Sequence, residues 1–108
     1  MRRVMVRYRV KPDRADENEQ LVRAVYAELK ELDPEGFRYR TFRLEDGVSF
    51  VHVAESEGSQ NPLPELDAFN EFQREIEDRC DEQPVVTMFN EVGSFASGSR
   101  AGAAPSPR

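Results

Sequence analysis

FRYRTFRLEDGVSFVHVAE, residues 37–55, carries the strongest local signal in the chain. Residues 37–45 and 48–55 are two strand-like runs, and Asp46-Gly47 separates them. Asp-Gly is a pair that a two-residue type I′ hairpin turn favours, because both of its positions need a positive φ. We therefore predict a tight β-hairpin in which Arg43 lies opposite Phe50.

The predicted register decides which side chains share a face, because facing residues project from the same side of a sheet. It also places Glu45 opposite Val48, Thr41 opposite His52 and Tyr39 opposite Ala54. One face therefore carries Tyr39, Thr41, Arg43, Phe50, His52 and Ala54. The other face carries Arg38, Arg40, Phe42, Leu44, Val51 and Val53.

Four further segments flank the hairpin. Residues 3–10 alternate with the period of two that is typical of a strand. Residues 14–32 and 63–80 each carry one apolar stripe at helical spacing. Residues 85–92 form the last predicted strand, so the predicted order is β-α-β-β-α-β.

This order predicts a single ferredoxin-like α+β domain over residues 1–95, followed by a flexible Gly/Ser/Ala/Pro-rich tail over residues 96–108. Right-handed crossovers give a four-stranded antiparallel sheet in the order 4-1-3-2, with both helices on one face. The other face would carry Met5, Phe42, Val51 and Val53, which is too apolar to leave in water. We therefore expect a homodimer in which a second copy covers that face.

Composition excludes several classes of protein. No apolar run is long enough to span a membrane, and the basic N-terminus lacks the apolar stretch of a signal peptide. The net charge of −6 argues against nucleic-acid binding. The single Cys80 excludes an internal disulfide and is typical of a reducing compartment, so we expect a cytoplasmic protein.

One cluster of polar side chains is a candidate small-molecule site. His52, the only histidine, shares a predicted face with apolar neighbours and could act as a general base or a hydrogen-bond donor. Tyr8 can lie on the same face, with Tyr39, Thr41 and Arg43 nearby. The wall of this pocket would include Phe50, Phe69 and Phe72. The alternative is ordinary packing, with His52 held by Thr41 in the core.

The remaining candidate residues give weaker evidence for a functional site. Asn70 could point into the pocket or lie at the surface, and Cys80 is expected to be a buried, inert thiol. One histidine and one cysteine with scattered carboxylates cannot build a metal site, so we expect no metal and no cofactor. Isolated glycines in turns make no phosphate-binding loop.

The chain resembles the dimeric α/β-barrel superfamily and its antibiotic-biosynthesis-monooxygenase-like domains. The resemblance is carried by the order of elements and by residues 6–12, 41–47 and 48–53. The resemblance implies two protomers packed sheet to sheet, each with a ligand cavity between sheet and helices. Members include cofactor-independent oxygenases of aromatic polyketides and haem-degrading enzymes. This chain departs from both, since it has no tryptophan and its histidine lies in a predicted strand.

Two hypotheses about function follow. In the first, the chain is a cofactor-independent oxygenase or related enzyme acting on a small aromatic or apolar molecule. His52 would then move a proton, and Tyr8 or Arg43 would orient an oxygen atom. In the second, it is a non-catalytic dimeric module for small-ligand binding or protein interaction. A cavity lined by Tyr8, His52 and Phe72 would favour the first hypothesis.

Overall fold

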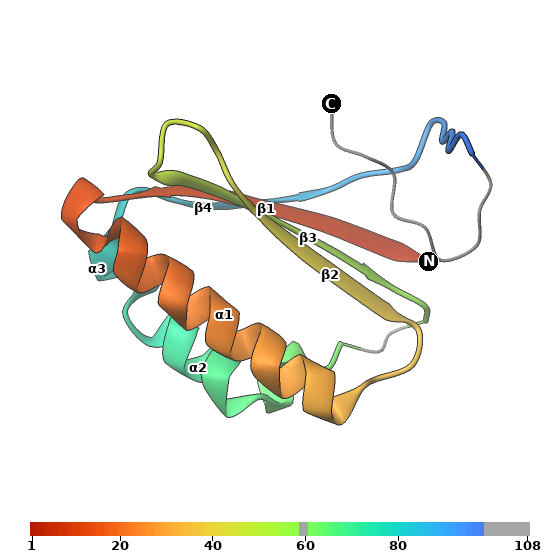
Figure 1. Ribbon diagram of the computed structural model, residues 1–108, viewed down its shortest axis with the longest axis horizontal. Helices are drawn as coiled ribbons and strands as arrows, with labels where there is room; N and C mark the ends of the chain where they lie inside the picture. The colour runs from red at the N-terminus through yellow and green to blue at the C-terminus, as the bar shows by residue number, and fades with distance from the viewer. Residues whose placement is uncertain (59–60, 99–108) are drawn as a thin grey trace.

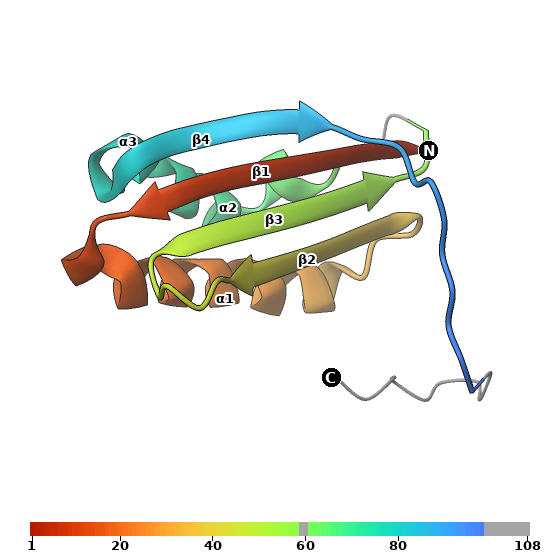
Figure 2. The same cartoon turned by 90° about the horizontal axis from the view of Figure 1, so that it is seen from above.

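Four antiparallel strands form one sheet, and the helices lie on a single face of it (Figures 1 and 2). A computed structural model describes residues 1–58 and 61–98. Its elements are β1 (Arg2–Val10), η1 (Pro12–Arg14), α1 (Ala15–Leu32), β2 (Phe37–Arg43), β3 (Ser49–Ser56), η2 (Leu63–Glu65), α2 (Asp67–Arg74), α3 (Ile76–Arg79) and β4 (Cys80–Met88). The strand order β2-β3-β1-β4 confirms the predicted ferredoxin-like α+β sheet.

The hairpin register is confirmed, but the predicted two-residue turn is wrong. Arg43 pairs with Phe50 and Thr41 with His52, as predicted. The connection is a longer loop over residues 45–48, closed by a 2.8 Å hydrogen bond from Leu44 N–H to Ser49 O, so Glu45 and Val48 do not pair.

Asp46 explains the longer loop. A type I′ turn would need a positive φ at both central positions, yet Gly47 has φ +81° and Asp46 does not have a positive φ. The Asp46 carboxylate instead accepts hydrogen bonds from the N–H groups of Val48 and Ser49, at 2.9 and 2.8 Å. This local bonding by the side chain, which is common for Asp in turns, stabilises the wider connection.

The second predicted helix is broken into η2, α2 and α3, so the prediction of one helix over residues 63–80 is wrong. In a continuous helix the Phe72 carbonyl would accept the N–H of Ile76. Here the guanidinium of Arg79 donates to that carbonyl at 2.7 Å. The chain leaves helical geometry at Glu75, with φ −128°, and α2 is therefore only eight residues long.

The last strand begins and ends earlier than predicted. It starts at Cys80, which pairs with Val10, and it ends at Met88 instead of continuing to residue 92. Pro84 lies inside it, at a register irregularity on the edge strand, where a missing N–H is tolerated. The early start places Cys80 in the sheet and not in the second helix.

The core lies between the sheet and the helices. Tyr8, Val10, Val25 and Phe50 are each at most 2% exposed. On the outer face of the sheet Phe42 and Val85 remain 44% and 62% exposed. Among the described residues, no helix is both long and apolar enough to cross a membrane. The domain boundary at residue 95 stays a prediction, and residues 99–108 of the predicted tail lie outside the described residues.

Candidate functional site

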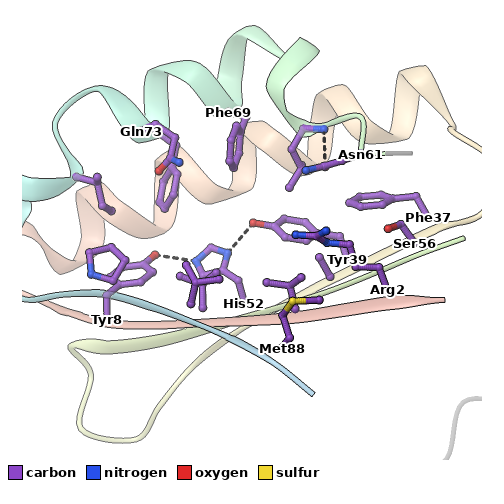
Figure 3. A pocket seen from close by; sticks show the side chains of 18 of the residues that line it. Arg2, Tyr8, Phe37, Tyr39, His52, Ser56, Asn61, Phe69, Gln73 and Met88 are labelled. Atoms are coloured by element: carbon purple, nitrogen blue, oxygen red, sulfur yellow. Dashed lines mark hydrogen bonds between the residues drawn. The ribbon is translucent and has the colours of Figure 1, made fainter. Parts of the chain in front are cut away.

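A cavity of about 1470 Å³ lies between the inner face of the sheet and α2 (Figure 3). It exists because α2 is short and leaves part of β1 and β4 uncovered. Val86 and Met88 point toward the helix side from β4, yet they are 64% and 61% exposed, so they border the opening. Phe69 and Phe72 form the opposite wall.

His52 lies in the floor of this cavity and is bonded on both ring nitrogens. Its Nε2 lies 2.8 Å from Tyr8 Oη. Its Nδ1 lies 2.7 Å from Tyr39 Oη and 3.1 Å from Thr41 Oγ1. The imidazole is 5% exposed, so three hydroxyl groups fix its orientation against apolar surroundings.

The hydrogen bonds continue on both sides of this group. Asn18 Nδ2 donates to Tyr8 Oη at 2.8 Å, and Arg79 Nε donates to Asn18 Oδ1 at 3.0 Å. On the other side, Tyr26 Oη lies 2.8 Å from Thr41 Oγ1. We call the series Arg79–Asn18–Tyr8–His52–Tyr39 the polar chain. It runs from the buried end of α3, through α1, to the cavity floor.

Sequence reasoning missed Asn18, Tyr26 and Arg79. Asn18 is fully buried and lies four residues before Val22, on the apolar stripe of α1, and this spacing was a usable signal. Arg79 is 1% exposed and stacks on Phe72 with its guanidinium carbon 5.2 Å from the ring centroid. An arginine in the last turn of a helix normally reaches solvent, so nothing in the sequence indicated its burial.

Burial sets the protonation of the polar chain. It lowers the pKa of His52 to about 4, so the ring is neutral at pH 7. It also raises the pKa of Tyr8 and Tyr39 far above the usual range, although the hydrogen bond from Asn18 partly offsets this at Tyr8. Desolvation lowers the pKa of Arg79, yet a guanidinium stays charged under any ordinary condition.

The structure brings together four of the residues that the sequence singled out: Tyr8, Tyr39, Thr41 and His52. Phe69 and Phe72 lie in the cavity wall, and their contact with a ligand stays a prediction. Phe50 lies behind the cavity floor, 1% exposed, and stacks on Tyr8 with ring centroids 5.6 Å apart.

Arg43 lies elsewhere. Its guanidinium pairs with Asp16 at 3.1 Å and Glu19 at 2.7 Å, and it also donates to the Gly47 carbonyl at the hairpin loop. It is not among the residues that line the cavity. Sequence reasoning grouped it with His52 because they share a strand face, but Arg43 lies at the far end of β2.

Asn70 and Cys80 also take no part in the polar chain. The Asn70 side chain is exposed and donates to the Pro64 carbonyl at 3.2 Å. Cys80 is 6% exposed, and burial raises the pKa of its thiol, which disfavours the reactive thiolate. In the part of the chain that the structure describes, no three His, Cys, Asp or Glu side chains gather into a metal site.

Comparison with known proteins gives structural neighbours only. No protein-family model and no curated protein sequence matches the chain. A putative antibiotic biosynthesis monooxygenase from Nitrosomonas europaea superposes with a TM-score of 0.70 at 15% identity, covering 86% of this chain and 100% of that one. A mutant of SnoaB, a cofactor-independent oxygenase from Streptomyces nogalater, gives a TM-score of 0.63 at 15% identity, covering 87% and 95%.

The same architecture also serves other activities. An L-rhamnose mutarotase from Formosa agariphila superposes with a TM-score of 0.53 at 17% identity, covering 87% of this chain and 98% of that one. At these identities the neighbours establish the fold and leave the reaction open. The chain has the ferredoxin-like fold of the antibiotic-biosynthesis-monooxygenase-like proteins, as the sequence resemblance implied.

Proposed function

We propose that the chain is a cofactor-independent oxygenase, or a related enzyme, that acts on a small, flat, largely apolar molecule bound in the cavity. The observation that carries this proposal is the polar chain, which ends in the floor of a cavity whose walls are mostly aromatic and aliphatic, with Arg2, Gln73 and Glu77 among its polar lining residues. Apolar walls with a few convergent polar groups are typical of small-molecule sites. The fold that the chain shares with SnoaB supports the choice of reaction.

In such a reaction the substrate supplies the electrons. A representative conversion is anthrone plus O₂ to anthraquinone plus water, in which one ring CH₂ becomes a carbonyl and the two hydrogens leave in the water. Tyr39, oriented by its hydrogen bond to His52, would hold the substrate oxygen, and Phe69 and Phe72 would hold its ring. Desolvation in the cavity strengthens each of these polar contacts.

The test measures oxygen uptake with anthrone, corrected for the rate without protein. We expect turnover by the wild-type chain. His52→Ala, which removes the centre of the polar chain, and Ala54→Phe, which places a ring in the part of the cavity beside Tyr39, should both abolish it. Arg23→Gln is the matched surface control, since the Arg23 side chain is 68% exposed and pairs with Glu19 on its own helix. Equal uptake by all four proteins would refute the proposal.

A second function, ligand binding without turnover, is favoured by one specific observation. Both ring nitrogens of His52 are occupied by protein hydroxyl groups, so the resting ring is not a free base. Saturable binding of anthrone without oxygen uptake above the background rate would identify the chain as a binding module.

A further inference from the structure

We propose that Arg79 and Asn18 fix which atom donates in every hydrogen bond along the polar chain, so that Tyr39 presents its O–H to the cavity. The site would then select ligands with an oxygen that accepts a hydrogen bond. The first half concerns the protein alone. The second half rests on the proposed function, since it assumes that the cavity holds a small molecule.

The direction starts at Arg79, whose guanidinium has only donors. Its Nε faces the Asn18 side chain at 3.0 Å, so the group that Asn18 turns toward it is the carbonyl Oδ1. The amide nitrogen of Asn18 then faces Tyr8 Oη at 2.8 Å and donates to it. Asn18 is fully buried between these partners, so its amide cannot flip without setting two donors against each other.

The next step passes through Tyr8. A tyrosine hydroxyl has one proton to donate. Because Tyr8 Oη already accepts from Asn18, that proton goes to the remaining partner, His52 Nε2, at 2.8 Å. Nε2 is therefore an acceptor, and a neutral imidazole with an acceptor at Nε2 carries its proton on Nδ1.

The last step reaches the cavity. Nδ1–H points at Tyr39 Oη, 2.7 Å away, and donates to it. No lone pair on the ring is left to receive the Tyr39 proton, so its possible acceptors are the Thr41 hydroxyl, which is also bonded to Tyr26 at 2.8 Å, and a group bound in the cavity. Tyr39 lines the cavity (Figure 3), so a ligand oxygen there can take the proton.

This direction defines the ligand chemistry. The positive charge of Arg79 polarises each successive hydrogen bond toward the cavity, and cooperative polarisation strengthens such chains. The O–H of Tyr39 therefore favours a carbonyl or phenolate oxygen over a bare hydrocarbon edge. A ligand whose one polar group is a donor, such as an aryl ammonium, meets the Tyr39 O–H as a second donor and gains less from this contact.

The proton direction is measurable in the wild-type protein. His52 is the only histidine, so long-range ¹H–¹⁵N correlation spectra of histidine-labelled protein report its tautomer without assignment. We expect the proton on Nδ1. A proton on Nε2 at pH 7 would overturn the proposal, and no variant is needed to see it.

Asn18→Asp is the near-isosteric switch. A carboxylate would accept from both Arg79 and Tyr8, so the Tyr8 proton would turn away from His52. The ring proton should then move to Nε2, and Tyr39 should donate to Nδ1 instead of to the cavity. A variant that folds and keeps the Nδ1 proton would contradict the assigned role of Asn18. Arg23→Gln, with the Nδ1 proton retained, is the control.

Two matched probes test ligand selection: 9-fluorenone, with one carbonyl oxygen, and fluorene, with none. We expect the wild-type protein to bind the ketone about fivefold more tightly than the hydrocarbon, the ratio that one net neutral hydrogen bond provides. Tyr39→Phe and Asn18→Asp should bring the ratio close to one. An unchanged ratio in Tyr39→Phe would overturn the ligand half of the inference. Binding of neither probe would refute the proposed function, while the tautomer would still decide the proton direction.

Discussion

His52 is 5% exposed and has a pKa near 4, against 6.5 for an unperturbed histidine. Its unfolded form therefore binds a proton more readily than its folded form does. The stability associated with the neutral ring is complete above pH 6.5, declines as the pH falls toward 4, and changes no further below that. The full decline is about 3 kcal/mol.

Urea denaturation between pH 7 and pH 4 measures this decline. We expect the free energy of unfolding of the wild-type protein to fall by more than that of His52→Gln, whose side chain does not titrate. The difference between the two proteins isolates the histidine from the carboxylates. Parallel curves for the two proteins would show that His52 does not titrate with a depressed pKa.

At the level of single residues, the site was predictable where strand periodicity applies. Tyr8 and His52 lie on one face because they have the same parity in neighbouring strands, and Tyr39 and Thr41 follow from the hairpin register. Asn18 and Arg79 were not found, because their roles depend on contacts between residues 61 positions apart. Arg43 has the right parity, but its position along β2 takes it to the helix acids.

At the level of elements, Arg79 explains why α2 ends. Its guanidinium bonds the Phe72 carbonyl at the C-terminal end of α2, where a positive charge also complements the helix dipole. Replacing it with Leu would leave that carbonyl and Asn18 Oδ1 buried without a donor.

We expect Arg79→Leu to lower the free energy of unfolding by about 2–4 kcal/mol, the cost of leaving buried polar groups without partners. Arg74→Gln is the matched control, because Arg74 is exposed and pairs with Glu71 within α2. It should change stability by less than about 0.5 kcal/mol. Urea denaturation compares the two, and equal effects would show that Arg79 is not a structural cap.

Local sequence signals predicted the type of each element but not the break in the second helix or the length of the hairpin loop. The apolar positions of residues 63–80 suit a helix, and a single apolar stripe does not reveal that a distant guanidinium will interrupt it. The hairpin register was predictable because Asp-Gly marks a turn between two alternating runs. The loop length was not, because it depends on the Asp46 side chain bonding two backbone N–H groups.

At the level of the whole molecule, the outer face of the sheet remains to be covered. Phe42 and Val85 are exposed there, beside the exposed arginines Arg7 and Arg40. We predict a homodimer that buries the apolar side chains of this face, with a mass about twice the chain mass of 12.4 kDa.

Light scattering after size-exclusion chromatography tests this assembly. Phe42→Asp should shift the mass toward that of one chain, because a carboxylate would be buried in the interface. Leu32→Asp, which changes a similarly exposed side chain at the end of α1 (50% against 44% for Phe42), should leave the mass unchanged. A wild-type mass of one chain at micromolar concentration would rule out this use of the outer face.

We propose that the cavity above His52 is a ligand site. Its most direct test is a titration of ¹⁵N-histidine-labelled protein with 9-fluorenone, following the nitrogen shifts of the single imidazole. We predict a saturable shift in the wild-type protein and none in Ala54→Phe, whose added ring takes the space beside Tyr39 and His52. An unshifted spectrum in the wild-type protein, or the same shift in both proteins, would contradict the account.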